Sequence, residues 1–164
     1  YDSSGLSDSK LPDTQAGWEK AMTTLLGAMG GSNYMHHAAG MLESMIAVAY
    51  EQYVIDDEII GMSGKVLQGI AVDAEHLALE VIDQVGPGGE YMTAEHTLKH
   101  MYDEFFQGNG VTDRMNREMW TEQGSRDTRT RARQIAKKIL EDEERPYISQ
   151  QLDQLIRNKY EIYI

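Results

Sequence analysis

A long apolar stripe within residues 41–70 constrains this chain more than any other feature of its sequence. Apolar side chains recur there at alternating steps of four and three residues, which is the spacing of one helix face. They are Met41, Met45, Val48, Ile55, Ile59, Met62, Val66 and Ile70, with Gln52 as the one polar interruption. We therefore predict one helix of about 45 Å, at 1.5 Å per residue. A second apolar ridge lies one position further on, so other elements must cover this helix on more than one side.

Residues 33–40 lead into the stripe, and we predict that they are the end of a buried strand that turns at Gly40 into the helix. This segment contains the adjacent histidines His36 and His37. Because alternate side chains of a strand point to opposite faces, we expect at most one of the two to face a site. An ordinary core histidine fits the pattern equally well. A strand end that feeds a helix is where α/β enzymes place their chemistry.

The motifs around this stretch resemble a known protein family. The run NYMHHAAGMLESMIAVAYEQYVIDDEIIGM follows SDSKLPDTQAGWEKA and precedes VGPGGEY and EHTLKHM. In this order they are similar to the C-terminal part of the trimethylamine methyltransferase family, over nearly the whole chain. The resemblance implies an α/β fold, the (β/α)8 TIM barrel, of which this sequence is the C-terminal portion. We expect the chain to be mainly helical with one or two short strands, with residues 1–72 as the last βα units of the barrel and residues 73–164 as a helical region that packs on it.

The resemblance also implies an activity. Members of the family pass a methyl group from a methylated amine to the Co(I) corrinoid (cobalamin) of a partner corrinoid protein and bind no cofactor directly. The substrate is a quaternary amine such as glycine betaine, or trimethylamine. Members that act on trimethylamine rely on pyrrolysine just upstream of the SDSK motif. The ordinary residues 1–5 favour the glycine betaine-type branch, but a chain that starts just past a pyrrolysine would look the same, so the substrate stays open.

Five residues are candidates for the site of this chemistry. We predict that His36 and Glu51 are catalytic, and that Tyr34, Tyr50 and Glu43 bind substrate. Tyr34 would share the strand face of His36, and Tyr50 would form one wall of an aromatic cage that attracts a cation. Glu51 would stabilise that cation in a cavity of low dielectric constant. If Glu51 lies too far along the helix, Glu43 in the first turn replaces it.

Composition limits the partners and the compartment. A net charge of −12 argues against nucleic acid, because phosphate binding needs a basic face. We find no uncharged apolar stretch of about 18 residues, and therefore expect no membrane span. The chain contains no cysteine, which rules out disulfides and thiolate metal sites within it and fits a cytoplasmic protein. We also expect the protein to form a homo-oligomer.

Two charged segments have more than one interpretation. Solvent exposure is the simplest interpretation of the mid-helix acids Asp56, Asp57 and Glu58, although aspartate is mildly unfavourable there. The basic residues within 126–138 precede the acids 141–144, which is the opposite of the order that a helix dipole favours. Contact with acidic parts of the same fold explains this order, and docking of a partner protein is the alternative.

Two histidines and an aspartate near residue 100 could bind a metal, which leads to other classes of function. His96 and His100 lie one helical turn apart and Asp103 follows, which is a permissible set of metal ligands. Their face is opposite the apolar one, so we assign it to solvent and predict no bound metal. The alternatives to a methyltransferase are a non-catalytic helical interaction module and a metal-binding protein that uses histidine and carboxylate.

Overall fold

The computed structural model describes residues 1–142 and 147–161, and they are mainly helical. The helices are α1 Thr14–Met29, α2 Tyr50–Gln68, α3 Ala74–Leu77, α4 Leu79–Val85, α5 Glu95–His100, α6 Arg117–Glu122, α7 Thr128–Glu141 and α8 Gln150–Lys159. Strands β1 (Met41–Leu42) and β2 (Ala47–Val48) form one antiparallel hairpin, and Asp2 makes an isolated parallel bridge to Met35. The expected mixture of helices and short strands is confirmed for this part of the chain, and the barrel stays a prediction.

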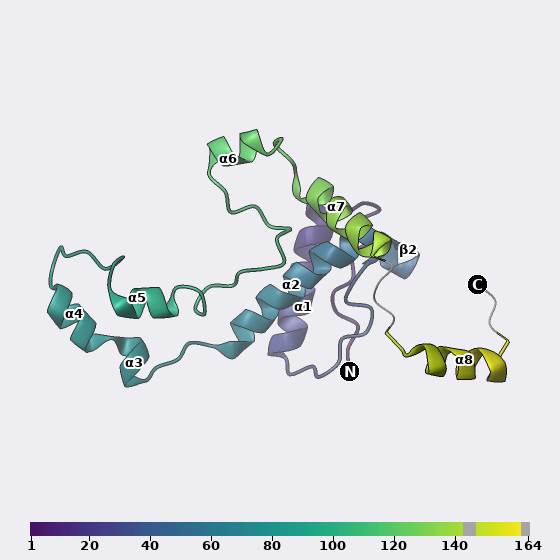
Figure 1. Cartoon of the computed structure of the whole chain (residues 1–164), viewed down its shortest axis with the longest axis horizontal. Helices are drawn as coiled ribbons and strands as arrows, with labels where there is room; N and C mark the ends of the chain where they lie inside the picture. Colours follow the sequence, from purple (N-terminus) through teal and green to yellow (C-terminus); the bar gives the residue numbers. More distant parts are fainter. Residues whose placement is uncertain (143–146, 162–164) are drawn as a thin grey trace.

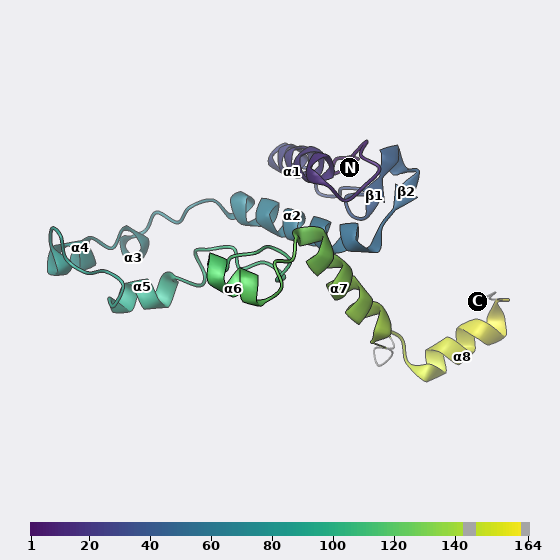
Figure 2. The same cartoon turned by 90° about the horizontal axis from the view of Figure 1, so that it is seen from above.

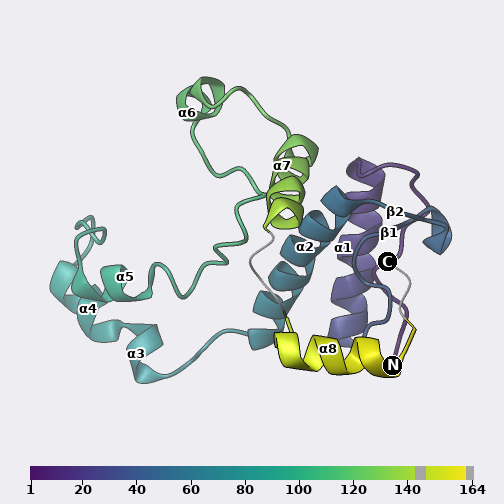
Figure 3. The same ribbon diagram turned by 45° about the vertical axis from the view of Figure 1, so that its right-hand side comes forward.

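Helix α2 lies at the centre, with α1 on one side and α7 on another (Figure 1). All three views show that α3, α4 and α5 extend away from this group (Figures 1 to 3). Side-chain caps start several helices: Asp13 accepts from the amide of Ala16, and Asp127 accepts from that of Thr130. None of the described helices is long and apolar enough to cross a membrane.

The prediction of one helix from residue 41 is wrong, because α2 begins only at Tyr50. Residues 43–45 have φ angles of 49°, 50° and 73°, the left-handed region, and they form the tight turn between β1 and β2. The segment 1–10 holds this turn in place: the amide of Glu43 donates to the carbonyl oxygen of Ser9, and that of Ser44 donates to the carbonyl oxygen of Ser7. Apolar spacing cannot distinguish this hairpin from an extra helical turn, because each of its strands contains only two residues.

The face of α2 that the chain buries is largely polar. Its buried residues are Glu51, Gln52, Val54, Asp56, Glu58 and Ser63. The small apolar core joins α2 to α7 through Val54, Val111, Ala132 and Ala136. By contrast, the C-terminal part of the predicted apolar stripe is open to solvent, with Val66 54% exposed and Ile70 89% exposed, whereas Ile55 is half-buried and packs against the core. Within the described residues, therefore, the C-terminal end of the stripe lacks cover.

We predict that the 164-residue chain, produced by itself, associates through this stripe, because large exposed apolar patches favour contact with other chains. Sedimentation velocity should show species larger than a monomer that grow with concentration. Val66→Glu should shift the distribution toward the monomer, whereas Lys138→Glu on α7 should leave it unchanged. A single monomeric species at every concentration would contradict this prediction.

Candidate functional site

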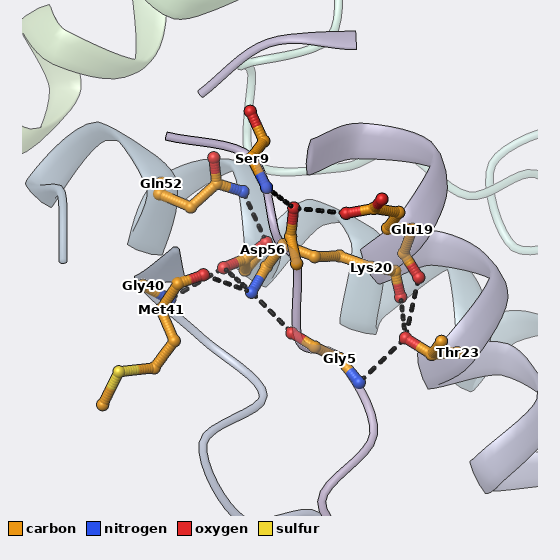
Figure 4. A network of polar contacts seen from close by, with 10 residues as sticks. Gly5, Ser9, Glu19, Lys20, Thr23, Gly40, Met41, Gln52 and Asp56 are labelled. Carbon is orange, nitrogen blue, oxygen red and sulfur yellow. Dashed lines mark hydrogen bonds and ion pairs between the residues drawn. The ribbon is translucent and has the colours of Figure 1, made fainter. Parts of the chain in front are cut away.

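A buried ion pair joins the two central helices beneath the segment that carries the predicted site residues. Lys20 of α1 and Asp56 of α2 are 3.1 Å apart, and their side chains are 0% and 1% exposed. The Lys20 ammonium also donates to the carbonyl oxygens of Gly5 at 2.5 Å and Met41 at 3.1 Å (Figure 4). An ammonium has three protons to donate. Lys20 therefore has a partner for each of them and connects α1 with the N-terminal segment, β1 and α2.

Asp56 is surrounded by donors as well (Figure 4). Its carboxylate accepts from the amide of Gly40 at 2.7 Å and from the side-chain amide of Gln52 at 2.7 Å. Burial raises the pKa of Asp56 above its ordinary range, although the Lys20 charge and these hydrogen bonds act in the opposite direction. Gly40 has a φ of 81°, and an added Cβ would lie 2.3 Å from the Tyr53 ring, so only glycine fits here.

An aromatic cluster forms around His36, in the segment that precedes this ion pair. The Tyr1 hydroxyl is 3.1 Å from Nδ1 of His36. The ring centroids of Tyr34 and His36 are 5.9 Å apart, and those of Tyr1 and Tyr34 are 6.0 Å apart. Tyr34 and His36 thus lie together, as the sequence suggested. Tyr1 and Tyr34 are 79% and 59% exposed, which leaves much of their ring surface open to a ligand.

The expectation that His36 and His37 point to opposite faces is wrong. Their ring centroids are only 3.4 Å apart. His37 has a φ of 64°, so the chain leaves the extended conformation at this residue, and the alternation of a strand no longer applies. The regular pairing that we expected over residues 33–40 is reduced to the bridge at Met35.

Glu51 is placed differently from the free carboxylate that the sequence suggested. It is 8% exposed, and its carboxylate accepts from Nε of Arg129 on α7 at 3.2 Å. Burial acts to raise the pKa of Glu51, but hydrogen bonds from its own amide and from Arg129, with the charges of Arg133 and Arg129, lower it overall. The basic run of α7 therefore contacts an acidic part of the same fold, as the simpler of the two interpretations predicted.

The other two predicted residues lie outside the cluster around His36. Tyr50 is 65% exposed at the start of α2, and no ring contact joins it to the cluster around His36 in the described part of the chain. Glu43 is half-buried in the left-handed turn of the hairpin. The structure thus brings Tyr34 and His36 together, and it places Glu51 in a separate pair with Arg129.

Solvent exposure is the wrong interpretation for two of the three mid-helix acids. Asp56 belongs to the buried ion pair, and Glu58 is 4% exposed and accepts from the backbone amide of Asn109 at 2.7 Å. Asp57 is exposed, and it accepts from the side-chain amide of Asn109 at 2.9 Å. Sequence reasoning missed Lys20 and Asn109 entirely. The one available signal was the mid-helix position of the acids, which called for an explanation.

A histidine and carboxylate cluster lies away from this region, between α3 and α5. The groups close enough to share an ion are Glu75, His96 and His100, and, around the same His100, His76 and Glu104. Asp103, the third ligand considered from the sequence, belongs to neither set. The hydrogen bond to Asp73 raises the pKa of His76 above its ordinary value.

Comparison with known proteins assigns the chain to a family. The family described as Trimethylamine methyltransferase (MTTB) matches residues 1–161. This chain belongs to that family. The family that the motifs suggested is therefore confirmed, and the placement of the chain in the C-terminal part of such proteins stays a prediction.

Relatives within the trimethylamine methyltransferase family are named for two different substrates. The glycine betaine methyltransferase of Desulfitobacterium hafniense (strain Y51) is 36% identical over 160 residues, which are 98% of this chain and 32% of that protein. Trimethylamine methyltransferase MttB of Methanosarcina barkeri is 38% identical over 142 residues, 87% of this chain and 28% of that protein. The chain thus spans about a third of the length of these relatives.

We predict that Lys20→Met lowers the free energy of unfolding by about 3–5 kcal/mol, because it leaves the Asp56 charge buried without its partner. The double variant Lys20→Met, Asp56→Leu should lose less than the sum of the two single variants, since it removes both charges together. Lys10→Met, at an exposed lysine, should change the value by no more than about 0.5 kcal/mol. Urea unfolding of the wild-type protein, the two single variants, the double variant and Lys10→Met measures these values. If Lys20→Met unfolds at the wild-type midpoint, the pair does not hold the fold together.

A second prediction concerns the dependence of the unfolding free energy on pH. Because the folded state lowers the pKa of Glu51, its pair with Arg129 contributes stability above the ordinary glutamate pKa, about 4.3, and loses it as the pH falls through the lowered value. Glu51→Gln should therefore reduce the acid-induced loss of unfolding free energy, by no more than about 1 kcal/mol because Arg129 is partly exposed. Glu141→Gln, in an exposed pair with Lys137, is the matched control and should have a smaller effect. An unchanged pH profile for Glu51→Gln would contradict the pairing.

Proposed function

We propose that the protein carrying this chain transfers a methyl group from a methylated amine to the Co(I) corrinoid of a partner protein, and that a quaternary amine such as glycine betaine is the preferred substrate. The observation that carries this proposal is the family match over residues 1–161. Similarity to the glycine betaine methyltransferase over 98% of the chain supports the choice of a quaternary amine, and trimethylamine is the alternative substrate.

The reaction is a displacement at carbon. The partner's corrinoid supplies the Co(I) nucleophile and receives the methyl group. The C–N bond breaks and its electron pair stays on nitrogen, so a quaternary amine leaves as a neutral tertiary amine and no proton transfer is required. The protein's work is then to hold the cation with one methyl group directed outward and to keep water away from it.

Tyr34 and His36 are the side chains that we propose contact the ammonium group. Cations are attracted to the faces of aromatic rings within about 6 Å of the centroid. The two rings lie together, and Tyr1 extends the same surface. In the structure these rings lie close to one another rather than around a closed cage, so the ammonium would bind against their outer faces, with Tyr50 as a possible further wall supplied from α2.

A carboxylate near the cation completes the site, and Glu51 and Glu43 remain the two candidates. The Glu51 charge is already paired with Arg129, which reduces what it can offer to a ligand. Glu43 lies in a turn of three consecutive non-glycine residues with left-handed φ angles. Such strained conformations cluster at ligand-binding sites, and this supports Glu43 as the carboxylate that faces the cation, with Glu51 holding the start of α2 in place.

The test compares Glu43→Gln with Glu51→Gln in the intact protein, supplied with its corrinoid partner and either glycine betaine or trimethylamine. We expect one of the two variants to lose about 2–4 kcal/mol of transition-state stabilisation in kcat/KM. Glu80→Gln, an exposed change on α4, should keep wild-type turnover. If both variants fold normally and retain full turnover, other parts of the protein must build the substrate site. If neither amine is demethylated by the wild-type protein, the proposed function itself is wrong.

A further inference from the structure

The histidine and carboxylate cluster between α3 and α5 plays no part in the proposed methyl transfer. Its ligand atoms lie within 4.8 Å of one another in each of two sets, Glu75 with His96 and His100, or His76 with His100 and Glu104. The second set comes from α3, from the last residue of α5 and from the turn that follows α5. Imidazole nitrogen and carboxylate oxygen are the donors that zinc and similar divalent ions bind.

Hydrogen bonding makes His76 suitable for a metal. Its Nδ1 is 2.7 Å from the Asp73 carboxylate, which can only accept, so Nδ1 carries a proton and Nε2 can present a lone pair. A carboxylate behind the imidazole is the usual arrangement that orients a metal-binding histidine. On the other side, Nε2 lies 3.5 Å from the Glu104 carboxylate. Two ligands of a tetrahedral zinc ion, each at about 2.0–2.1 Å, are separated by about 3.3–3.4 Å, which is close to this distance.

The other set is less available. His96 has its Nε2 2.8 Å from the carbonyl oxygen of Glu75, so Nε2 carries the proton and only Nδ1 has a lone pair for a metal. The Glu75 carboxylate already forms an ion pair with the Lys99 ammonium. A metal bound there would have to displace the Lys99 ammonium from Glu75, whereas a metal at His76 and Glu104 would replace the contact between these two residues and compete with Glu75 for His100, whose Nε2 is 3.2 Å from the Glu75 carboxylate.

We propose that His76, His100 and Glu104 bind one divalent transition-metal ion, such as Zn²⁺, with Asp73 as the residue that positions His76. From the sequence we assigned His96 and His100 to solvent because their face is opposite the apolar one, and Asp103 was the third ligand considered. The structure supplies His76 from α3 instead, and it places Glu104 one turn beyond His100, whose carbonyl oxygen accepts from the Glu104 amide at 3.0 Å. The ion would fasten α3 to α5, helices that extend away from the α1, α2 and α7 group (Figure 1).

The test is calorimetric titration of ZnCl₂ into the intact protein after removal of metal by a chelator, with Co²⁺ absorption spectra as a second readout. We expect one ion per chain. His76→Ala, His100→Ala and Glu104→Gln should each weaken binding by about 10-fold or more, since even the loss of residues that orient ligands costs about 10-fold to 100-fold. Circular dichroism checks folding, and Glu104→Gln keeps the size of the side chain.

Three further variants decide between the two sets. His96→Ala and Glu75→Gln should change the zinc affinity by less than the ligand variants do. His37→Gln, at a histidine that belongs to neither set, is the matched control. If His96→Ala and Glu75→Gln abolish binding while His76→Ala and Glu104→Gln do not, the ligand assignment is overturned. If the wild-type protein binds no more Zn²⁺ than a His76→Ala, His100→Ala double variant, the site does not exist.

Discussion

The buried ion pair between Lys20 and Asp56 is the interaction on which the rest of the structure depends. It removes two charges from water, which is favourable only when their remaining hydrogen-bonding groups are satisfied. Here the Lys20 ammonium donates to the carbonyl oxygens of Gly5 and Met41, and the Asp56 carboxylate accepts from the amide of Gly40. A single pair thus fixes four stretches of the chain, and the hairpin that carries Glu43 lies directly beyond them.

Local sequence signals were sufficient for parts of this fold. The start of α1 and the start of α7 were predictable because a capping aspartate acts on an amide only three residues away. The pair between Lys20 and Asp56 was not predictable, because its partners are 36 positions apart and meet only through the packing of α1 against α2. The hairpin at residues 41–48 was missed for a related reason: its turn depends on bonds to the segment 1–10, which leave no trace in local spacing.

The candidate site was predictable only in part. Tyr34 and His36 do lie together, since they are close in sequence and in one short segment. The partner of Glu51 could not be predicted, because Arg129 approaches from a helix 78 residues further on. The exposed part of the apolar stripe can be compared with the face of α2 that is buried. The chain buries the polar face of this helix itself and leaves the C-terminal part of the apolar stripe exposed, and it spans only about a third of its relatives' length.

The measurement that most directly tests the account is a crystal structure of the intact protein with a bound quaternary amine that cannot be demethylated. The account predicts that the ammonium group lies within about 6 Å of the ring centroids of Tyr34 and His36, as attraction to aromatic faces requires. It also predicts that Glu43 or Glu51 is the nearest carboxylate. An ammonium group bound beyond the reach of all four side chains would contradict the account, because the recognition of the substrate would then belong to another part of the protein.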